Sequence, residues 1–308
     1  MESLDLNLLM ALHALLEERN VTRAGQRVGL SQPAMSSNLG RLRRHYGDEL
    51  LIRVGNTYEL TPLATALVDP TALAVNVVDR VFSARPRFDP SESDREFTLV
   101  ASDYVLTVLG NPLMRRLAAT APGVRIRFLQ INVPRVDDID ATLRSTDGLI
   151  MPHGFISTHP YTDVYSDRWV IIADPANPAL ADGITMDHLG TLPWVTAFRG
   201  PTAASFAIRQ LTMLGIEPNV EVVVENFQSL PFLIPGTSRI ALIQERLAHR
   251  LTAVGGFRLH PCPFEAVPIL EAFWFHTVHQ ADPAHRWLRE TLTEVGQEIE
   301  HEPGNAPH

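Results

Sequence analysis

Apolar residues near the start of the chain repeat at helical spacing. Those between 6 and 16 lie on more than one side of a helix that we expect to run from a cap at Asp5 to about Asn20. A helix that is apolar on two sides usually contacts its own domain with one and a partner with the other. A second, short helix is expected over 22–28, capped by Thr22.

A turn and a third helix follow directly. Gly29 allows a tight turn because glycine adopts a positive φ, and Ser31 is a suitable cap for a helix over 32–46. The inward side of that helix is formed by Met35, Leu39, Leu42 and Tyr46. The opposite side is small or polar, and it consists of Pro33, Ser36, Ser37, Gly40, Arg41 and Arg44. Two helices joined by a short glycine-containing turn form the plan of a helix-turn-helix.

The polar side of the third helix is suited to a DNA groove. Small residues let a helix lie deep in the major groove, where glutamine pairs with adenine and arginine with guanine. We predict base contacts from the first turns and phosphate contacts from the arginines. The predicted DNA-binding residues are Thr22, Ser31, Gln32, Pro33, Ser36, Ser37, Arg41, Arg44 and Arg53. The alternative is a solvated helix of an ordinary three-helix bundle.

A hairpin and a long helix are expected next. Residues 50–53 and 58–60 resemble two short strands, so they predict a wing from which Arg53 reaches a phosphate or the minor groove. A helix begins at Thr61 with a proline at its first position, and Pro70 is expected to kink or interrupt it. A long helix leading out of such a module suits dimerisation, because paired modules must be held one helical turn of DNA apart.

Charge supports this division of the chain. The net charge is −9, but residues 1–66 are neutral, and the stretch 19–53 holds seven arginines against only Asp48 and Glu49. Positive charge is therefore concentrated where phosphates would be met, although chance clustering on a solvated face is an alternative. No apolar run reaches the roughly 20 residues that cross a bilayer, and no secretory signal is recognised. The single Cys262 cannot form an internal disulfide, which fits a cytoplasmic protein.

The remainder of the chain alternates strand-like and helix-like segments. Strands are expected at 97–101, 124–128, 169–173, 221–224 and 269–275, with a helix at 111–120. Such alternation predicts an α/β fold with parallel sheets and crossover helices. The segments 169–173 and 269–275 are interpreted as crossovers between two lobes.

Several segments together resemble the LysR-type transcriptional regulators. Those of the N-terminal module are 21–25, 29–36, 50–53 and 60–62. The segments 88–90, 102–103 and 282–289, together with Arg95, Phe97 and His276, are similar to the NodD/NahR/DntR-like branch of that family. The resemblance covers nearly the whole chain, and it is densest at 20–65 and 270–290.

The resemblance implies a definite domain organisation. It comprises a winged helix-turn-helix at 1–62, a linker and dimerisation helix at 63–88, and an effector-binding domain at 91–302 that is similar to two-lobed periplasmic binding proteins. The lobes are expected to contain 91–168 plus 268–302, and 169–267. A ligand of such a domain binds between the lobes, at strand ends and helix starts.

Those positions nominate effector-binding residues. They are Ser102, Asp103, Tyr104, Trp194, Thr196, Phe198, Asn226, Phe227 and His276. Free amides where a helix opens at 102–104 favour an anion, and the aromatic residues would stack on an aromatic ligand. The effector is expected to be a small molecule, aromatic or anionic. Core packing is the alternative for each aromatic residue, and a buried hydrogen-bonded histidine is the favoured alternative for His276.

Enzyme and cofactor functions are not indicated. The sequence lacks G-x-S-x-G, G-x-G-x-x-G and Walker-A runs. The acidic cluster of Asp137, Asp138 and Asp140 is explained by a solvated helix start. A metal site at His276, His279 and His285 is disfavoured because a strand and a later helix are expected to carry them. We therefore predict no enzyme activity, no cofactor and no metal.

The sequence thus predicts a ligand-responsive regulator that binds double-stranded DNA as a homodimer or homotetramer. Two alternatives stay open: a constitutive DNA-binding regulator with a vestigial pocket, and a small-molecule-binding module or enzyme with an incidental N-terminal bundle.

Overall fold

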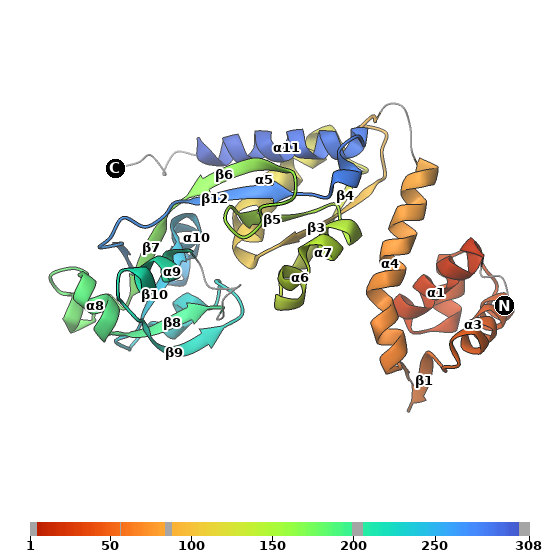
Figure 1. Cartoon of the computed structure of the whole chain (residues 1–308), viewed down its shortest axis with the longest axis horizontal. Coiled ribbons are helices and arrows are strands. Elements are labelled where there is room, and N and C mark those ends of the chain that lie inside the picture. Colours follow the sequence, from red (N-terminus) through yellow and green to blue (C-terminus); the bar gives the residue numbers. More distant parts are fainter. Residues whose placement is uncertain (1–4, 56, 84–87, 199–205, 302–308) are drawn as a thin grey trace. The chain divides into compact units, whose positions relative to one another are not determined.

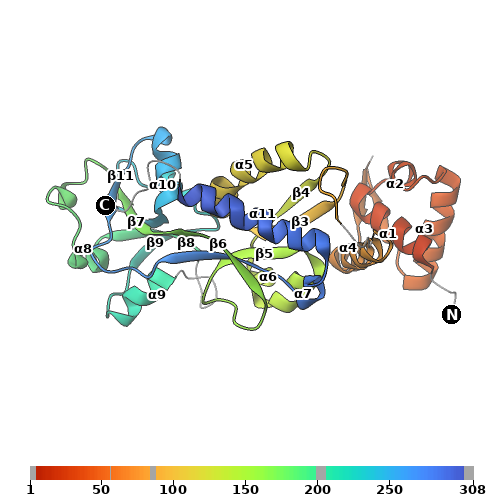
Figure 2. The ribbon, with the colours of Figure 1, turned by 90° about the horizontal axis from the view of Figure 1, so that it is seen from above.

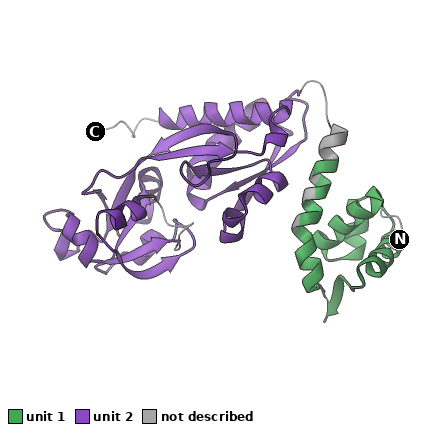
Figure 3. Ribbon diagram, in the orientation of Figure 1, with its two compact units in different colours: residues 1–86 green, residues 87–308 purple. Residues whose placement is uncertain are grey.

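The computed structural model describes residues 5–55, 57–83, 88–198 and 206–301 (Figure 1). The chain divides into two compact units, residues 1–86 and 87–308 (Figure 3). None of the helices within the described residues is both long and apolar enough to span a bilayer. Asn56, within the predicted wing, and residues 302–308 lie outside the described residues.

The first unit is a winged helix-turn-helix followed by a long helix. Its elements are α1 (Leu6–Glu18), α2 (Val21–Arg27), α3 (Gln32–Tyr46), β1 (Leu51–Val54), β2 (Thr57–Leu60) and α4 (Pro62–Ser83). Asp5 and Ser31 cap α1 and α3 as predicted, since their side chains accept hydrogen bonds from the backbone amides of Leu8 and Ala34. The predicted cap at Thr22 is wrong. The side chain of Asn20 caps α2 instead, by accepting from the amide of Arg23, because only a residue with extended backbone before the first turn can do so.

The core of this unit explains the two apolar sides of α1. One side packs on α2 and α3, and the other is covered by α4 of the same chain. The buried residues of the core lie mostly on α1 and α3, and they include Leu8, Leu12, Leu15, Leu16, Met35, Leu39 and Leu42. No partner is therefore needed to bury the second side of α1. The expectation that this side meets a partner is wrong, because α4 of the same chain covers it.

The turn of the helix-turn-helix depends on a close backbone approach. The amide of Leu30 donates to the carbonyl of Gly25 at 2.8 Å. A Cβ on Gly25 would lie 2.8 Å from the carbonyl oxygen of Leu30, so only glycine lets α2 approach the turn this closely. Gly29 has a φ of +69°, as the predicted turn requires.

Pro70 does not interrupt the long helix. α4 runs through it from Pro62 to Ser83, so the predicted interruption is wrong. A proline removes only one helical hydrogen bond, and packing on α1 also stabilises α4.

The second unit contains two five-stranded sheets, each at the centre of a lobe (Figures 1 and 2). The first sheet has the order β4 (Arg125–Gln130), β3 (Glu96–Ala101), β5 (Gly148–Pro152), β12 (Ile269–Trp274) and β6 (Tyr161–Asp167). Its helices are α5 (Asp103–Thr120), α6 (Val133–Asp137), α7 (Ile139–Ser145) and α11 (Pro283–Glu300). α5 and α11 cover one face, and α6 and α7 the other. The expected helix at 111–120 begins earlier, at Asp103, because Ser102 caps it.

The second lobe is built around the other sheet. Its order is β11 (Arg258–Pro261), β7 (Trp169–Ala173), β10 (Ile240–Gln244), β8 (Pro193–Ala197) and β9 (Asn219–Val224). Its helices are α8 (Met186–Thr191), α9 (Phe206–Met213) and α10 (Glu245–Leu251). Short 3-10 helices occur at Pro178–Leu180, Leu230–Leu233, Thr252–Val254 and Thr277–His279. The chain passes between the lobes twice, at Arg168 and over 262–268.

Candidate functional site

One side of α3 presents its polar residues to solvent. Gln32, Pro33, Ser36 and Ser37 are exposed, and we call these four residues the reading face. The apolar side, with Met35, Leu39 and Leu42, is buried in the module. The helix therefore combines a polar outer side without bulky groups and an anchored inner side, as a recognition helix requires.

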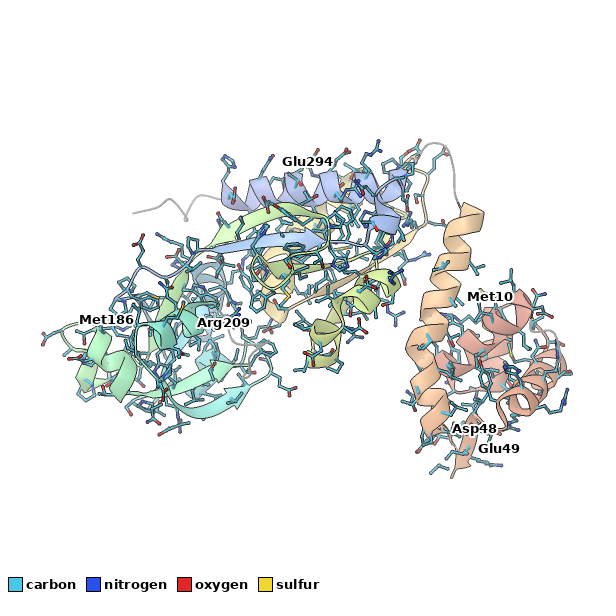
Figure 4. All side chains as sticks on the ribbon, in the orientation of Figure 1. Met10, Asp48, Glu49, Met186, Arg209 and Glu294 are labelled. Atoms are coloured by element: carbon cyan, nitrogen blue, oxygen red, sulfur yellow. The ribbon has the colours of Figure 1, made fainter. Side chains whose placement is uncertain are left out.

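The arginines around this helix divide into two groups. Arg23 and Arg27 form ion pairs with Glu17 and Glu18 of α1. Arg43 contacts Glu49 at 2.9 Å and donates to the carbonyls of Glu49 and Leu51, so it ties α3 to the wing. Glu17 and Glu18 lie just before the arginine-rich stretch 19–53, and their carboxylates neutralise part of the positive charge of that stretch. Figure 4 labels Asp48 and Glu49 in the short connection between α3 and β1.

The three arginines predicted to contact phosphates differ in their exposure and in their contacts. Arg44 is exposed near the end of α3, and Arg41 is half-buried with its guanidinium 3.6 Å from Asp5. Arg53 is exposed on the wing, where it donates to the carbonyl of Gly55 at 3.1 Å. Thr22 and Ser31 are exposed at the starts of α2 and α3.

A pocket of about 330 Å³ lies between the two lobes of the second unit. Its wall is mainly apolar and aromatic, with contributions from the first lobe at 131–136, 150–155 and 269–271 and from the second lobe at Trp169 and Phe198. Volume and lining are typical of a small-molecule site.

Four of the nine predicted effector-binding residues line this pocket: Ser102, Tyr104, Phe198 and Phe227. Phe198 has a φ of +61°, a strained conformation for a non-glycine residue, and its ring lies 5.6 Å from that of Phe227. Strained backbone of this kind concentrates at ligand-binding positions. Tyr104 donates its hydroxyl hydrogen to Asp167 at 2.7 Å, which leaves its ring in the wall.

The other five residues do not line the pocket, and each has a structural contact instead. Trp194 is fully buried in the core of the second lobe, where its indole NH donates to the carbonyl of Leu189. The hydroxyl of Thr196 donates to backbone carbonyls, and Asn226 accepts from the amide of Ser229. Trp194 and Thr196 lie on the same side of β8, because side chains alternate along a strand, and Asn226 lies beyond the end of β9.

Asp103 and His276 are also occupied elsewhere. The Asp103 carboxylate accepts from the amide of Gln228 at 2.7 Å and so joins the two lobes. A negative charge in the first turn of α5 disfavours the anion that was predicted there. His276 caps a short 3-10 helix through Nδ1, which accepts from the amide of Val278.

Besides the less buried Asn132 and His153, sequence reasoning missed two buried polar residues of the pocket wall, Glu271 and Gln244. Both are buried, at 2% and 3% exposure, and Oε2 of Glu271 and Oε1 of Gln244 have no hydrogen-bond partner among the described residues. Glu271 interrupts the apolar run of β12 next to a β-bulge, and Gln244 ends that of β10. A polar residue inside or at the end of an apolar strand was the signal available in the sequence.

Burial changes the ionisation of the carboxyl groups beside the pocket. Loss of solvation, together with the neighbouring charge of Asp167, raises the pKa of Glu271 to about 8. Burial likewise raises the pKa of Asp167 to about 6, although the hydrogen bond from Tyr104 opposes this rise. Glu271 is therefore a neutral acid at pH 7.

Stability is expected to fall as the pH rises toward 8. Between the ordinary pKa of 4.5 and about 8, folded Glu271 holds a proton that the unfolded chain releases. Its contribution is fully present below pH 4.5 and is lost through about pH 8, with a slope of at most about 1.4 kcal/mol per pH unit. Asp167 acts with the same sign up to about pH 6. Chemical denaturation across this range should show a flatter curve above pH 6 for Glu271→Gln, whereas the exposed Glu217→Gln should leave it unchanged.

The histidines near α11 have structural contacts. The rings of His279 and His285 stack with centroids 4.7 Å apart, and each Nε2 lies within hydrogen-bond distance of a carbonyl, that of Thr146 or Asp147. Burial lowers the pKa of His285 to about 3. Within the described part of the chain, no group of three or more His, Cys, Asp or Glu residues could hold a metal ion. Asp138 caps α7, as expected for the acidic cluster at a helix start.

Comparison with known proteins gives matches over nearly the whole chain. Residues 6–65 match the family described as "Bacterial regulatory helix-turn-helix protein, lysR family", and residues 90–297 match "LysR substrate binding domain". Nodulation protein D of Rhizobium leguminosarum bv. trifolii is 35% identical over 304 residues, which are 97% of this chain and 94% of that protein.

Solved structures show the same architecture. The crystal structure of the probable transcriptional regulator PA0477 from Pseudomonas aeruginosa matches with a TM-score of 0.77 and 30% identity, covering 94% of this chain and 97% of that one. Full-length CbnR, solved with its target DNA, matches with a TM-score of 0.64 at 15% identity, covering 96% of this chain and 100% of that one, and thus shows the shared fold.

A DNA-binding helix-turn-helix in one unit and a two-lobed domain with an interlobe pocket in the other define a transcription regulator with an effector-binding domain. The chain belongs to the LysR family, and the resemblance inferred from its sequence is confirmed. It is a regulator and not an enzyme, so the reading as an enzyme or a binding module with an incidental bundle is wrong.

Proposed function

We propose that the reading face enters the major groove of an operator and that a small molecule in the interlobe pocket controls the assembly. The observation that carries this proposal is the exposed row of Gln32, Pro33, Ser36 and Ser37 opposite a fully anchored apolar side. Gln32 and the serines read base edges, and Arg41, Arg44 and Arg53 contact phosphates, with Thr22 and Ser31 at the helix starts beside them. As a DNA-binding regulator, the protein acts in the cytoplasm.

The protein is proposed to act as a homodimer or homotetramer. Operator half-sites lie one helical turn apart, so two modules must be held together. α4 offers exposed apolar side chains for this contact, among them Leu63 and Val77, at 37% and 47% exposure. An effector that changes the relation of the lobes would shift the population between two assemblies of the oligomer.

The pocket has the features of a site that closes around its ligand. The hydrogen bond from the amide of Gln228 in the second lobe to Asp103 in the first joins the two lobes, and Arg168, at the crossover between them, pairs with Glu245 at 2.7 Å. A ligand that binds one arrangement of the lobes more tightly than another would strengthen or break such contacts.

Two measurements test the proposal. A gel-shift assay of the full chain with the DNA that flanks its gene should show binding that survives excess unrelated DNA. Thermal unfolding in a panel of small metabolites should show an effector as a raised Tm, because a ligand of the native state stabilises it. Binding no tighter than to unrelated DNA would refute the operator. DNA binding without any ligand response would favour the constitutive regulator with a vestigial pocket.

A further inference from the structure

We propose that Glu271 and Gln244 form a recognition site for a hydrogen-bond-donating head group, a hydroxyl or an amine, carried by an otherwise apolar effector. This inference rests on the proposed role of the interlobe pocket, and it names the chemistry that the pocket selects.

The two residues reach the same pocket from different lobes. Glu271 belongs to β12 of the first lobe, where the register against β6 shifts between Glu271 and Ala272. A bulge of this kind redirects the side chain of a strand. Gln244 is the last residue of β10 in the second lobe, opposite Trp169. Both side chains line the pocket while only 2% and 3% exposed.

Each side chain leaves an oxygen atom without a hydrogen-bond partner. Oε2 of Glu271 and Oε1 of Gln244 form no hydrogen bond with any described residue. Buried polar atoms are almost always satisfied, and those that are not call for an explanation. A ligand with a polar head group would satisfy both oxygens, since Glu271 and Gln244 line one cavity whose remaining wall is mostly apolar.

Other polar groups of the wall are already engaged. Ser102 accepts from the amide of Val105 as the cap of α5, and Tyr104 donates to Asp167. Asn132 accepts from the amide of Arg135, and Nε2 of His153 lies 2.6 Å from the carboxylate of Asp163. The specificity of the pocket therefore depends on Glu271 and Gln244, while the aromatic rings of Phe198 and Phe227 enclose the body of the ligand.

This chemistry revises the expectation of an anionic effector. Burying a carboxylate within this mostly apolar wall is costly unless a cation neutralises it. None of the described lining residues is an arginine that could neutralise such a ligand. A hydroxyl group can donate to either acceptor, and an ammonium group would in addition ionise the neutral carboxyl of Glu271.

A ligand held by both residues would also connect the lobes. A bound ligand would then stabilise the arrangement of the lobes in which β10 and β12 both contact it. The ligand would bind this arrangement more tightly than others, as a conformational response requires.

The test uses four probes with the same ring system: naphthalene, naphthol, naphthylmethylamine and naphthoate. Isothermal titration and thermal unfolding of the full chain should give the tightest binding for naphthol or naphthylmethylamine, weaker binding for naphthalene and the weakest for naphthoate. Naphthoate binding as tightly as naphthol, or naphthol and the amine both binding no better than naphthalene, would overturn the proposal.

Variants assign the preference to the two residues. Glu271→Met and Gln244→Met should each weaken the better-bound donor probe about tenfold and leave naphthalene within about twofold, because only the acceptor is lost. Glu271→Gln keeps a neutral acceptor, so it should retain naphthol and selectively weaken the amine. It also provides the test if a methionine variant does not fold. Exposed Glu217→Gln is the matched control. A donor preference that survives in both methionine variants would refute the assignment.

Failure of this inference can be told from failure of the proposed function. The probe titrations need no DNA, and the gel shift of the same variants reports operator binding separately. Retained operator binding with no donor preference would refute the recognition site alone.

Discussion

Replacing Gly296 by alanine is expected to destabilise the two-lobed domain by about 3 kcal/mol or more. Gly296 is buried on α11 where this helix crosses β6. A Cβ at this position would lie 1.7 Å from the carbonyl oxygen of Val164 and 2.6 Å from its carbonyl carbon. Backbone atoms of a strand cannot move aside as the end of a side chain can, so the whole helix would have to shift from the sheet.

Denaturant unfolding of the full chain, followed through the tryptophans of the second unit, measures this effect. The matched control is Gly190→Ala on α8, where a Cβ would meet only Ile216, at 3.9 Å. That change should be neutral or stabilising by up to about 1 kcal/mol, because alanine favours a helix more than glycine does. Equal stability of the two variants would contradict the close contact between α11 and β6.

The helices of the N-terminal unit were predictable because their determinants are local. A cap at Ser31 and the spacing of Met35, Leu39 and Leu42 fix both the ends and the inward side of α3. The cap of α2 was assigned to Thr22 instead of Asn20, since both residues can cap and only the backbone conformation distinguishes them. Predicting what covers the second side of α1 requires knowing that α4 packs on it, and no local sequence pattern gives this contact.

The pocket was only partly predictable because its wall is assembled from distant segments. The positions of strand ends nominated Tyr104, Phe198 and Phe227, and these three residues line the pocket. Trp194 was nominated on the same grounds, yet the alternation of β8 turns it into the core of the second lobe. Glu271 was passed over within an apolar strand, although a lone carboxyl there indicates either a buried partner or a ligand.

Replacing Gln32 by alanine is expected to weaken operator binding about tenfold while leaving binding to unrelated DNA nearly unchanged. A bidentate contact between a glutamine and an adenine contributes about 1–3 kcal/mol of discrimination between bases. Gln32 is exposed in the first turn of α3, so its loss should not alter the thermal stability of the module. Gln297→Ala, at an exposed glutamine of α11, is the matched control and should change neither affinity.

The salt dependence of binding separates base contacts from phosphate contacts. Gln32→Ala should leave the slope of the logarithm of the association constant against that of salt concentration unchanged. Arg44→Ala should reduce the slope by about 0.9 and weaken binding to all sequences alike, because one fewer phosphate is neutralised. Titrations by fluorescence anisotropy at several salt concentrations, with operator and unrelated duplexes, measure both quantities. If Gln32→Ala weakened both duplexes equally, or if it left operator affinity intact, the first turn of α3 would not read bases, and the reading face would have to be placed elsewhere on the module.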